Sequence, residues 1–265
     1  CGLASIPFTE NFNSYGTGNN AFPDCWTKFN NYSTTPYPYI TATNNSGSTG
    51  GSLYFYSGTA SYNIAVMPEL NVDVNTLEVT FYLRVGSASN GLIVGVMTDA
   101  NDFNGFVPVD TVFCTSLSVF EYKEVDLNTY TGTGRFIAFK SLTTSTGAIY
   151  FDDLNVDLIP SCKRPGDVTV SNADMTSAVV AWTERGNATA WEIEYGPVGF
   201  TPGNGTTIQA STNPFTLTGL TSGTQYDVYV RANCGAGDIS DVSLNHATFA
   251  TSLCNAADQC EYVFT

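Results

Sequence analysis

Positive charge is scarce in this chain of 265 residues. Nine Lys and Arg residues stand against 24 Asp and Glu residues, so the formal net charge is −15 with the single histidine neutral. The field of such a chain repels phosphate backbones and anionic lipids, which argues against nucleic acid and membrane-surface partners. Charged residues make up only 12 % of the sequence, whereas 43 % are hydrophobic. This balance is that of a folded chain, and its length suggests two domains.

Long apolar runs are missing as well. The longest stretches, such as Leu92–Val94 and Gly95–Met97, are much shorter than the roughly 20 residues that span a bilayer. We therefore expect no membrane insertion. The N-terminal residues lack the pattern of a signal peptide, which fits a mature or excised segment.

Helix-forming sequence is nearly absent, which indicates an all-β chain. Thr, Ser, Asn, Gly, Tyr and Val dominate in short alternating runs, separated by turn clusters such as Asn44–Gly51. In Thr76–Val85 every second residue is apolar, as an antiparallel strand with one wet face requires. The residues on its apolar face are Leu77, Val79, Phe81, Leu83 and Val85. Similar alternation is found in Val119–Leu127, Arg135–Lys140 and Tyr150–Leu158.

A domain boundary is expected near Ile159-Pro160-Ser161, because the strand rhythm changes there. About a dozen strand candidates precede it, enough for a sandwich of two sheets, and a shorter set follows. The predicted domains are 1–160 and 161–252, and residues 253–265 are expected to be a linker or the start of a truncated further module.

The second domain resembles the fibronectin type III family. Trp182 lies on its second expected strand, and the stretch from Leu220 to Val230 has the leucine, turn and tyrosine-corner pattern, with Tyr226 as the corner. The likeness covers nearly all of residues 162–251. The expected strands are Asp167–Ser171, Ala178–Thr183, Thr189–Tyr195, Phe215–Leu217, Gln225–Ala232 and Val242–Phe249.

The first domain resembles the cleaved-adhesin modules of Bacteroidetes surface proteins, found in gingipain-type haemagglutinin regions and similar to MAM domains. The likeness is carried by Pro7–Phe12, by Cys25-Trp26 after a proline and by Ile149–Val156. It implies a secreted or cell-surface multidomain protein in which such modules alternate with fibronectin repeats. The fold class expected is all-β: a jelly-roll β-sandwich followed by an immunoglobulin-like (fibronectin type III) β-sandwich.

Seven cysteines occur without any Cys-x-x-Cys pair, and His246 is the single histidine, so a zinc site has too few ligands at usable spacing. Disulfides are the better interpretation for a secreted chain. Cys114, in an apolar run, is expected to be a buried free thiol. The expected bridges are Cys1–Cys25, Cys162–Cys234 and Cys254–Cys260.

Catalytic patterns are not found. A Ser-His-Asp arrangement would need His246, which lies in a fibronectin strand pattern and is expected to be an exposed strand residue. Asp152 and Asp153 are adjacent on one strand, so they cannot face each other across a cleft as glycosidase carboxylates do. We expect no enzyme activity from this chain.

Two carboxylates are candidates for a calcium site. Glu10 lies two residues from both Phe8 and Phe12, and Asp152 lies two residues from Leu154. Residues two apart on a strand share a face, so both acids are expected to face inward. Neither segment contains a Lys or Arg that could pair with the acids, so a cation is the simplest partner. Oxygen ligands favour calcium over transition metals. The resemblance also implies a structural cation near these two motifs. We expect backbone carbonyls and Asn13 to complete the oxygen shell of the ion. The alternative is that both acids lie at strand ends in water or accept backbone N–H bonds.

The segment Asp99–Gly105 is a second oxygen-rich candidate. It lacks the spacing and the terminal Glu of an EF-hand loop, so a surface turn rich in Asx residues is the simpler expectation. Whether Asp99, Asn101 and Asp102 bind an ion is left open.

Tyrosines crowd the first third of the chain. An exposed flat ring stacks on a pyranose face while neighbouring amides bond its hydroxyls, so such rings suit sugar recognition. The alternative is that these tyrosines only fill the faces and edges of the sandwich, because the residue packs well on strands. The candidate ligand-binding residues are Tyr37, Tyr39, Tyr54 and Tyr56.

Three functional classes remain. We favour a non-catalytic adhesion or binding module that recognises a glycan or a host extracellular protein, contains a structural calcium and contacts neighbouring modules of its own polypeptide. The alternatives are an accessory region of a secreted glycosidase or peptidase whose catalytic domain lies elsewhere, and a spacer.

Overall fold

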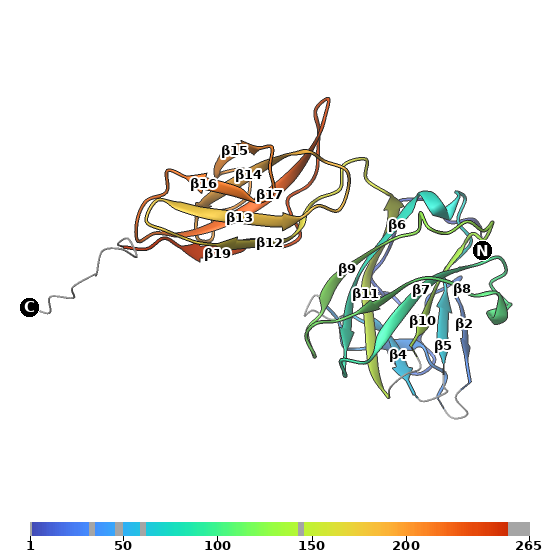
Figure 1. Ribbon diagram of the computed structural model, residues 1–265. Coiled ribbons are helices and arrows are strands. Elements are labelled where there is room, and N and C mark those ends of the chain that lie inside the picture. Colours follow the sequence, from blue (N-terminus) through green and yellow to red (C-terminus); the bar gives the residue numbers. More distant parts are fainter. Residues whose placement is uncertain (1, 32–34, 46–49, 59–61, 143–145, 254–265) are drawn as a thin grey trace, which may run out of the picture. The chain divides into compact units, whose positions relative to one another are not determined.

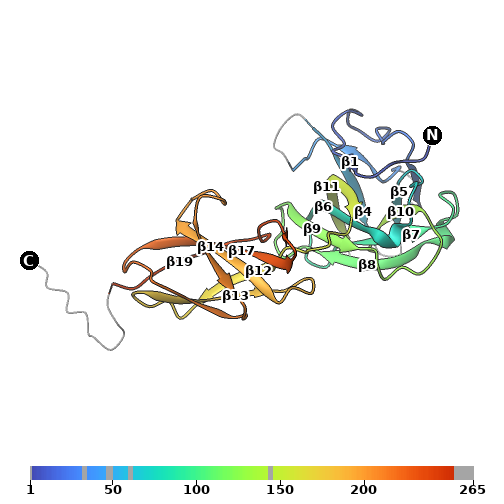
Figure 2. The same cartoon turned by 90° about the horizontal axis from the view of Figure 1, so that it is seen from above.

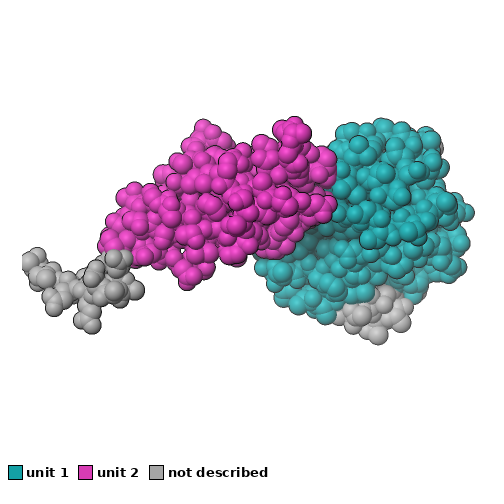
Figure 3. All heavy atoms as spheres, turned by 45° about the horizontal axis from the view of Figure 1, so that its top comes forward, with its two compact units in different colours: residues 1–159 teal, residues 160–265 magenta. Residues whose placement is uncertain are grey.

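The computed structural model describes all residues except 1, 32–34, 46–49, 59–61, 143–145 and 254–265. The chain divides into two compact units, Cys1–Ile159 and Pro160–Thr265 (Figure 3). In the described parts, no helix has the length and apolar character that a membrane crossing needs.

The first unit is a sandwich of two antiparallel sheets (Figures 1 and 2). One sheet has the order β3-β4-β11-β6-β9, with β1 beside β11, and the other has the order β2-β5-β10-β7-β8. The strands are β1 (Phe8–Glu10), β2 (Thr27–Asn30), β3 (Tyr39–Thr41), β4 (Ser52–Ser57), β5 (Asn63–Val66), β6 (Leu77–Val85), β7 (Gly91–Met97), β8 (Val107–Phe113), β9 (Glu121–Asp126), β10 (Phe136–Ser141) and β11 (Gly147–Leu158). Two short 3-10 turns, η1 (Val74–Thr76) and η2 (Phe103–Gly105), lie between strands.

The core of this unit follows from the alternation of its strands. In β6 the five residues expected on one face, Leu77, Val79, Phe81, Leu83 and Val85, are all fully buried. Phe139 of β10 in the opposite sheet lies with its ring centre 4.5 Å from that of Phe151 of β11. Since these rings join the two sheets, truncating either of them to Ala should cost about 3–5 kcal/mol of unfolding free energy.

A bulge interrupts β11 at the point where the acids lie. Its register with β6 shifts between Asp152 and Asn155, and Asp153 has a φ of 48°. Phe151 and Val156 are therefore both buried although they are an odd number of residues apart. Asp152 pairs with Tyr82, whose neighbours Phe81 and Leu83 face the core, so Asp152 lies on the outer face of the sheet. The expectation that Asp152 shares a face with Leu154 is corrected, because parity does not continue through a bulge.

The second unit is a smaller all-β sandwich. Its sheets have the orders β12-β13-β16 and β15-β14-β17-β18, with β19 also paired to β17. Its strands are β12 (Gly166–Ser171), β13 (Ser177–Thr183), β14 (Ala190–Pro197), β15 (Thr206–Ala210), β16 (Phe215–Thr218), β17 (Gln225–Gly235), β18 (Asp238–Ile239) and β19 (Ala247–Ala250). The hydroxyl of Tyr226 accepts a hydrogen bond from the Thr221 N–H at 3.0 Å, which is the tyrosine corner that the sequence predicts.

The last strand of this unit is shorter than expected. The sequence suggests a strand over Val242–Phe249, but β19 begins only at Ala247. Upstream, the Ser243 hydroxyl accepts the Val230 N–H, and the Ser240 hydroxyl accepts the Ala232 N–H. Side chains thus take the place of backbone carbonyls along β17, and no regular ladder forms there.

The cysteines follow the secreted pattern where they are described. Cys162 and Cys234 form a disulfide with a Cα–Cα distance of 5.7 Å, which confirms this predicted pair. Cys25 is disulfide-bonded, and its expected partner Cys1 lies outside the described residues, as do Cys254 and Cys260. Cys114 is a buried free thiol, as predicted.

Candidate functional site

A layer of tyrosines lies on the outer face of the sheet that contains β4. In this strand Leu53 and Phe55 are fully buried in the core, whereas Tyr54 and Tyr56 are half-buried on the opposite side. Tyr54 is cross-strand partner to Tyr39 of β3 on one side and to Tyr150 of β11 on the other. Side chains that oppose each other in an antiparallel pair share a face, so these rings form one surface.

The four tyrosines predicted as ligand-binding residues lie together. The ring of Tyr37 stacks on Tyr39 and on Tyr56, with ring centres 5.5 Å apart in each pair. Tyr54 meets Tyr37 and Tyr39 edge-on, and its ring centre lies 5.1 Å from that of Tyr150. We call Tyr37, Tyr39, Tyr54, Tyr56 and Tyr150 the tyrosine face.

Lys28 holds the loop that carries Tyr37. Its ammonium donates to the carbonyls of Pro36 and Pro38 at 2.9 and 3.0 Å, and it lies 4.7 Å from the centre of the Phe22 ring. Burial lowers the pKa of Lys28 below its ordinary value. Because both carbonyls flank Tyr37, Lys28 fixes that ring against the sheet.

The phenol groups of Tyr37, Tyr39 and Tyr54 are neutral at physiological pH. Burial raises the pKa of Tyr37, Tyr39 and Tyr54 above the ordinary value, and neighbouring tyrosines raise each of the three further. A neutral phenol both donates and accepts hydrogen bonds, so the face offers flat apolar rings with polar groups at their edges.

The tyrosine face continues onto β6 and β9. Arg84 of β6 is the cross-strand partner of Tyr150, and its guanidinium carbon lies 5.1 Å from the Tyr150 ring centre and 6.0 Å from that of Phe120. The sequence pattern did not single out Tyr150, Arg84 or Phe120. Tyr150 and Arg84 each lie between two apolar residues of their strand. This alternation was the sequence signal that could have placed both side chains on the outer face.

The predicted calcium ligand Glu10 lies at the end of β1. One of its carboxylate oxygens accepts the Phe12 N–H at 2.8 Å and the other accepts the Tyr15 hydroxyl at 2.6 Å. Burial, and then Glu10, raise the pKa of Tyr15 to about 12. A cavity of about 460 Å³ lies beside this end of the sheet, and Glu10, Tyr15 and Asp153 are among its lining residues.

Asp152 and Asn13 both hold the segment that ends at Gly51. Asp152 accepts the Asn45 N–H at 2.8 Å, and Asn13 Oδ1 accepts the Gly51 N–H at 2.9 Å. A Cβ built on Gly50 would lie 1.8 Å from Asn13 Oδ1, so only glycine permits this approach. Two of the three predicted ligands, Asn13 and Asp152, therefore contact one turn-rich segment.

The charges and oxygen donors around Asp152 are suited to a hard cation. Asp152 is only 2 % exposed, and burial, together with Asp153 and Glu10, raises its pKa to about 6 despite two backbone hydrogen bonds. Each carboxylate oxygen keeps a lone pair beyond the bonds described, so the donors suit an oxygen-ligated ion. No group of three or more His, Cys, Asp or Glu residues gathers as a metal site in the described ranges, so amide or carbonyl oxygens must complete a shell.

The Asp99–Gly105 loop is a set of Asx turns in the structure. Asp99 accepts the Asn101 N–H, and Asp102 accepts the Asn104 N–H at the start of η2. Phe103 stacks on Tyr62 with ring centres 5.4 Å apart, so the loop covers the outer face of the second sheet.

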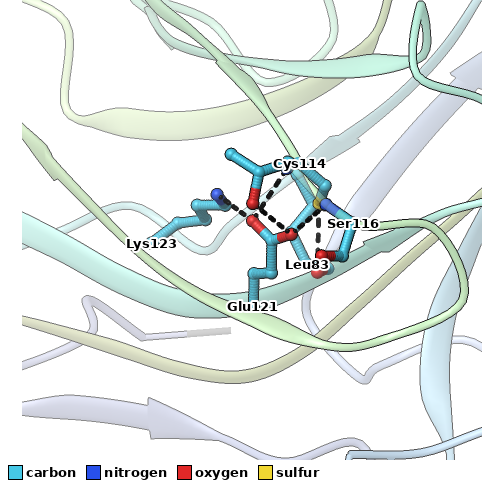
Figure 4. A network of polar contacts seen from close by, with 6 residues as sticks. Leu83, Cys114, Ser116, Glu121 and Lys123 are labelled. Carbon is cyan, nitrogen blue, oxygen red and sulfur yellow. Dashed lines mark hydrogen bonds and ion pairs between the residues drawn. The ribbon is translucent and has the colours of Figure 1, made fainter. Parts of the chain in front are cut away.

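A second polar network surrounds Glu121 on β9. Its carboxylate accepts hydrogen bonds from both the N–H and the hydroxyl of Thr115, from the Ser116 N–H and from the Lys123 ammonium (Figure 4). The thiol of Cys114 donates to the Leu83 carbonyl at 3.2 Å. Burial raises the pKa of this thiol to about 11, with Lys123 lowering it and Glu121 raising it. The cysteine is therefore an unreactive thiol under a pinned turn.

His246 does not take part in a nucleophile arrangement. Its Nε2 lies 3.8 Å from Asp227 Oδ1, and the Thr248 hydroxyl donates to that same carboxylate. Burial alone raises the pKa of Asp227, but bonds from Gly199 and Thr248 and the nearby His246 bring it below the ordinary value. Since the hydroxyl donates to the acid and not to the imidazole, the geometry differs from that of a triad.

The fold of the second unit can now be compared with known families. Residues 163–246 match the fibronectin type III domain. The matched range contains Trp182 and Tyr226, the two residues on which the resemblance in sequence rests. The comparison with curated proteins gives no match.

Three solved structures illustrate the similarity in fold. The K1 cleaved adhesin domain of Lys-gingipain from Porphyromonas gingivalis W83 is 18 % identical, with a TM-score of 0.43, and the match covers 57 % of this chain and 98 % of that one. The FN5 domain of Drosophila Lar is 23 % identical, with a TM-score of 0.30, covering 34 % and 97 %. A glycoside hydrolase domain, Endo-D from Streptococcus pneumoniae R6, is 14 % identical, with a TM-score of 0.38, covering 94 % and 44 %. The chain thus spans less than half of that hydrolase structure.

Proposed function

We propose that the chain is a non-catalytic binding module of a secreted or cell-surface multidomain protein and that its first unit binds a glycan on the tyrosine face. The observation that supports this most directly is the layer of five tyrosines on an outer sheet face, each of which contacts at least one other ring of the set. Flat neutral rings stack on the apolar face of a pyranose, and the phenol hydroxyls bond its hydroxyls. A host extracellular protein is the other ligand class that such a face could take.

Rigidity also supports the proposal. Tyr54 lies between strands on both sides, and Lys28 fixes the two carbonyls around Tyr37. A face that is ordered before the ligand arrives loses little conformational entropy on binding, so weak stacking contacts can add up to specific recognition.

The test is a glycan array probed with the full chain. Tyr54→Ala combined with Tyr56→Ala should abolish glycan signals, because it removes the centre of the face. Tyr62→Ala is the matched control, since Tyr62 is a half-buried tyrosine that stacks on Phe103 over the other sheet. An array on which the double variant and the native chain give equal signals would contradict the proposal.

We further propose a structural calcium ion held by Glu10, Asn13 and Asp152, with backbone carbonyls completing the oxygen shell. When bound, the ion would neutralise two carboxylates that repel each other, of which Asp152 is nearly fully buried and Glu10 is half-buried. Glu10 joins β1 to this site and Asp152 joins β11, so a common ion would fasten the first and last strands of the unit.

Chelation tests the ion separately from the glycan. An ion that binds only the folded state stabilises it by roughly 2.7 kcal/mol at a hundredfold excess over Kd. Excess chelator should therefore lower the melting temperature of the first unit, and Glu10→Gln should lower it equally and remove the response to chelator. Asp157→Asn, at a half-buried acid near the other end of β11, should behave like the native chain. An unchanged melting curve in chelator, with no metal found by elemental analysis, would refute the site.

A further inference from the structure

Arg84 is a cation beside the tyrosine face, and its side-chain contacts with the described residues are with aromatic rings. It lies on β6 between buried residues Leu83 and Val85 and points to the outer side of the sheet. Its guanidinium lies over the rings of Tyr150 and Phe120, at 5.1 and 6.0 Å from their centres. Contacts of this kind use the flat surface of the guanidinium and leave the N–H groups in its plane free to bond.

Within the described residues, no carboxylate pairs with Arg84. Two other cations of this unit do have acid partners: Lys123 pairs with Glu121 at 2.7 Å, and Arg135 pairs with Asp73 at 3.4 Å. Lys140 resembles Arg84, since it lies over the rings of Tyr62 and Phe106, but these belong to the other sheet. Asp152 of β11 lies on the same outer face, two residues from Tyr150, but accepts the N–H groups of Asn45 and Asp153. The nearest acid of β9 on this face is Glu124, whose cross-strand partner is Thr80. Thr80 precedes Arg84 by four residues, or about 13 Å along the strand.

An uncompensated cation is notable in a chain with nine Lys and Arg residues against 24 acids. The guanidinium presents a planar fork of donors that fits a carboxylate with two parallel hydrogen bonds. The aromatic contacts hold this fork beside the rings on which a sugar would stack. Arg84 could therefore bind a carboxylate group next to the aromatic rings on which a pyranose would stack.

We propose that the tyrosine face selects a saccharide with one carboxylated residue, a sialic or uronic acid, whose carboxylate pairs with Arg84 while its ring or its neighbour stacks on a neighbouring ring of the face. This inference rests on the proposed glycan binding and adds the ligand class. The net charge of −15 repels a polyanion, so an isolated acidic sugar is favoured over a polyuronate. The pairing of one cation with one carboxylate also predicts that binding weakens as salt is added.

The experiment compares acidic oligosaccharides with their carboxyl-reduced counterparts on the full chain. The probes carry a terminal sialic acid or a terminal glucuronic acid, and each is matched to the form in which the carboxylate has become a hydroxymethyl group. The native chain should bind at least one acidic probe ten or more times more tightly than its reduced form. Arg84→Gln should abolish this preference but keep binding of the reduced form, and Arg84→Lys should keep part of the preference. Arg135→Gln changes an exposed arginine that lies away from the tyrosine face, and this variant should keep the full preference for the acidic probe.

The outcomes separate this inference from the proposed function. Equal affinity for acidic and reduced probes, or an unchanged preference in Arg84→Gln, overturns the carboxylate site and leaves glycan binding standing. Tighter binding of a long polyuronate than of any single-acid probe also overturns it. Absence of all saccharide binding, with no effect of Tyr54→Ala on any ligand, overturns the proposed function itself. Thermal melting of each variant checks that the fold is retained.

Discussion

Glu121 should hold the turn above Cys114 closed, and replacing it with glutamine tests this. Its carboxylate accepts bonds from Thr115, Ser116 and Lys123, and its side chain is 17 % exposed. Burial alone raises its pKa, but these donors outweigh burial and lower the pKa from 4.5 to about 2. At 1.36 kcal/mol for each pKa unit, this difference corresponds to an upper value of about 3 kcal/mol.

The assay is the labelling rate of the Cys114 thiol in the native protein, measured at neutral pH by mass spectrometry of its peptide. Labelling requires the turn to open, because the thiol is buried. If Glu121→Gln removes about 2 kcal/mol of the closing free energy, labelling should be about 30 times faster. Glu124→Gln is the control, since its side chain projects from the other face of β9.

The pH dependence has a definite sign. A carboxyl whose pKa is lower in the folded state stabilises the fold above its unfolded pKa and loses that contribution as pH falls. The native chain should therefore label faster, relative to the intrinsic rate of the thiol, as the pH falls from about 4.5 to about 2, whereas Glu121→Gln should show a flatter profile. Equal labelling rates for the native chain and Glu121→Gln at neutral pH would refute the pinning role.

Three further outcomes are expected. Lys28→Met should weaken glycan binding several-fold with little change in melting temperature, because it frees the Tyr37 loop, and binding and melting measured together check this. Tyr226→Phe should lower the unfolding free energy of the fibronectin type III domain by about 1–2 kcal/mol in denaturant titrations, since the Thr221 N–H loses its acceptor. Replacing Cys162 and Cys234 with Ala should destabilise the same domain by about 4 kcal/mol for a bridge spanning 72 residues, measured calorimetrically.

Local alternation explains how much of the sandwich could be predicted. The fully buried set on β6 and the outward Tyr54 and Tyr56 follow from the period of two, which is a property of single strands. The corner at Tyr226 was also predictable, because its bond to Thr221 closes within five residues. Such features need no knowledge of which strands are neighbours.

The bulge at Asp152 and the shortened β19 show where this reasoning ends. At the bulge one extra residue reverses the face, and sequence parity contains no sign of it. Before β19 the hydroxyls of Ser240 and Ser243 accept N–H groups of β17, where the ladder of a continued strand would place backbone carbonyls. Both depend on register with another strand, which alternation within one strand does not encode.

The sequence by itself determined the all-β class, the buried faces, the free state of Cys114 and the Cys162–Cys234 bridge, because these rest on local periodicity and on the order of motifs. Only the tertiary structure decided that Tyr39, Tyr54 and Tyr150 come from adjacent strands and that Arg84 lies beside them. The physical reason is that strand order is fixed by packing two sheets over one core. In the tyrosine face, that packing brings together residues up to 111 positions apart in the sequence, from Tyr39 to Tyr150.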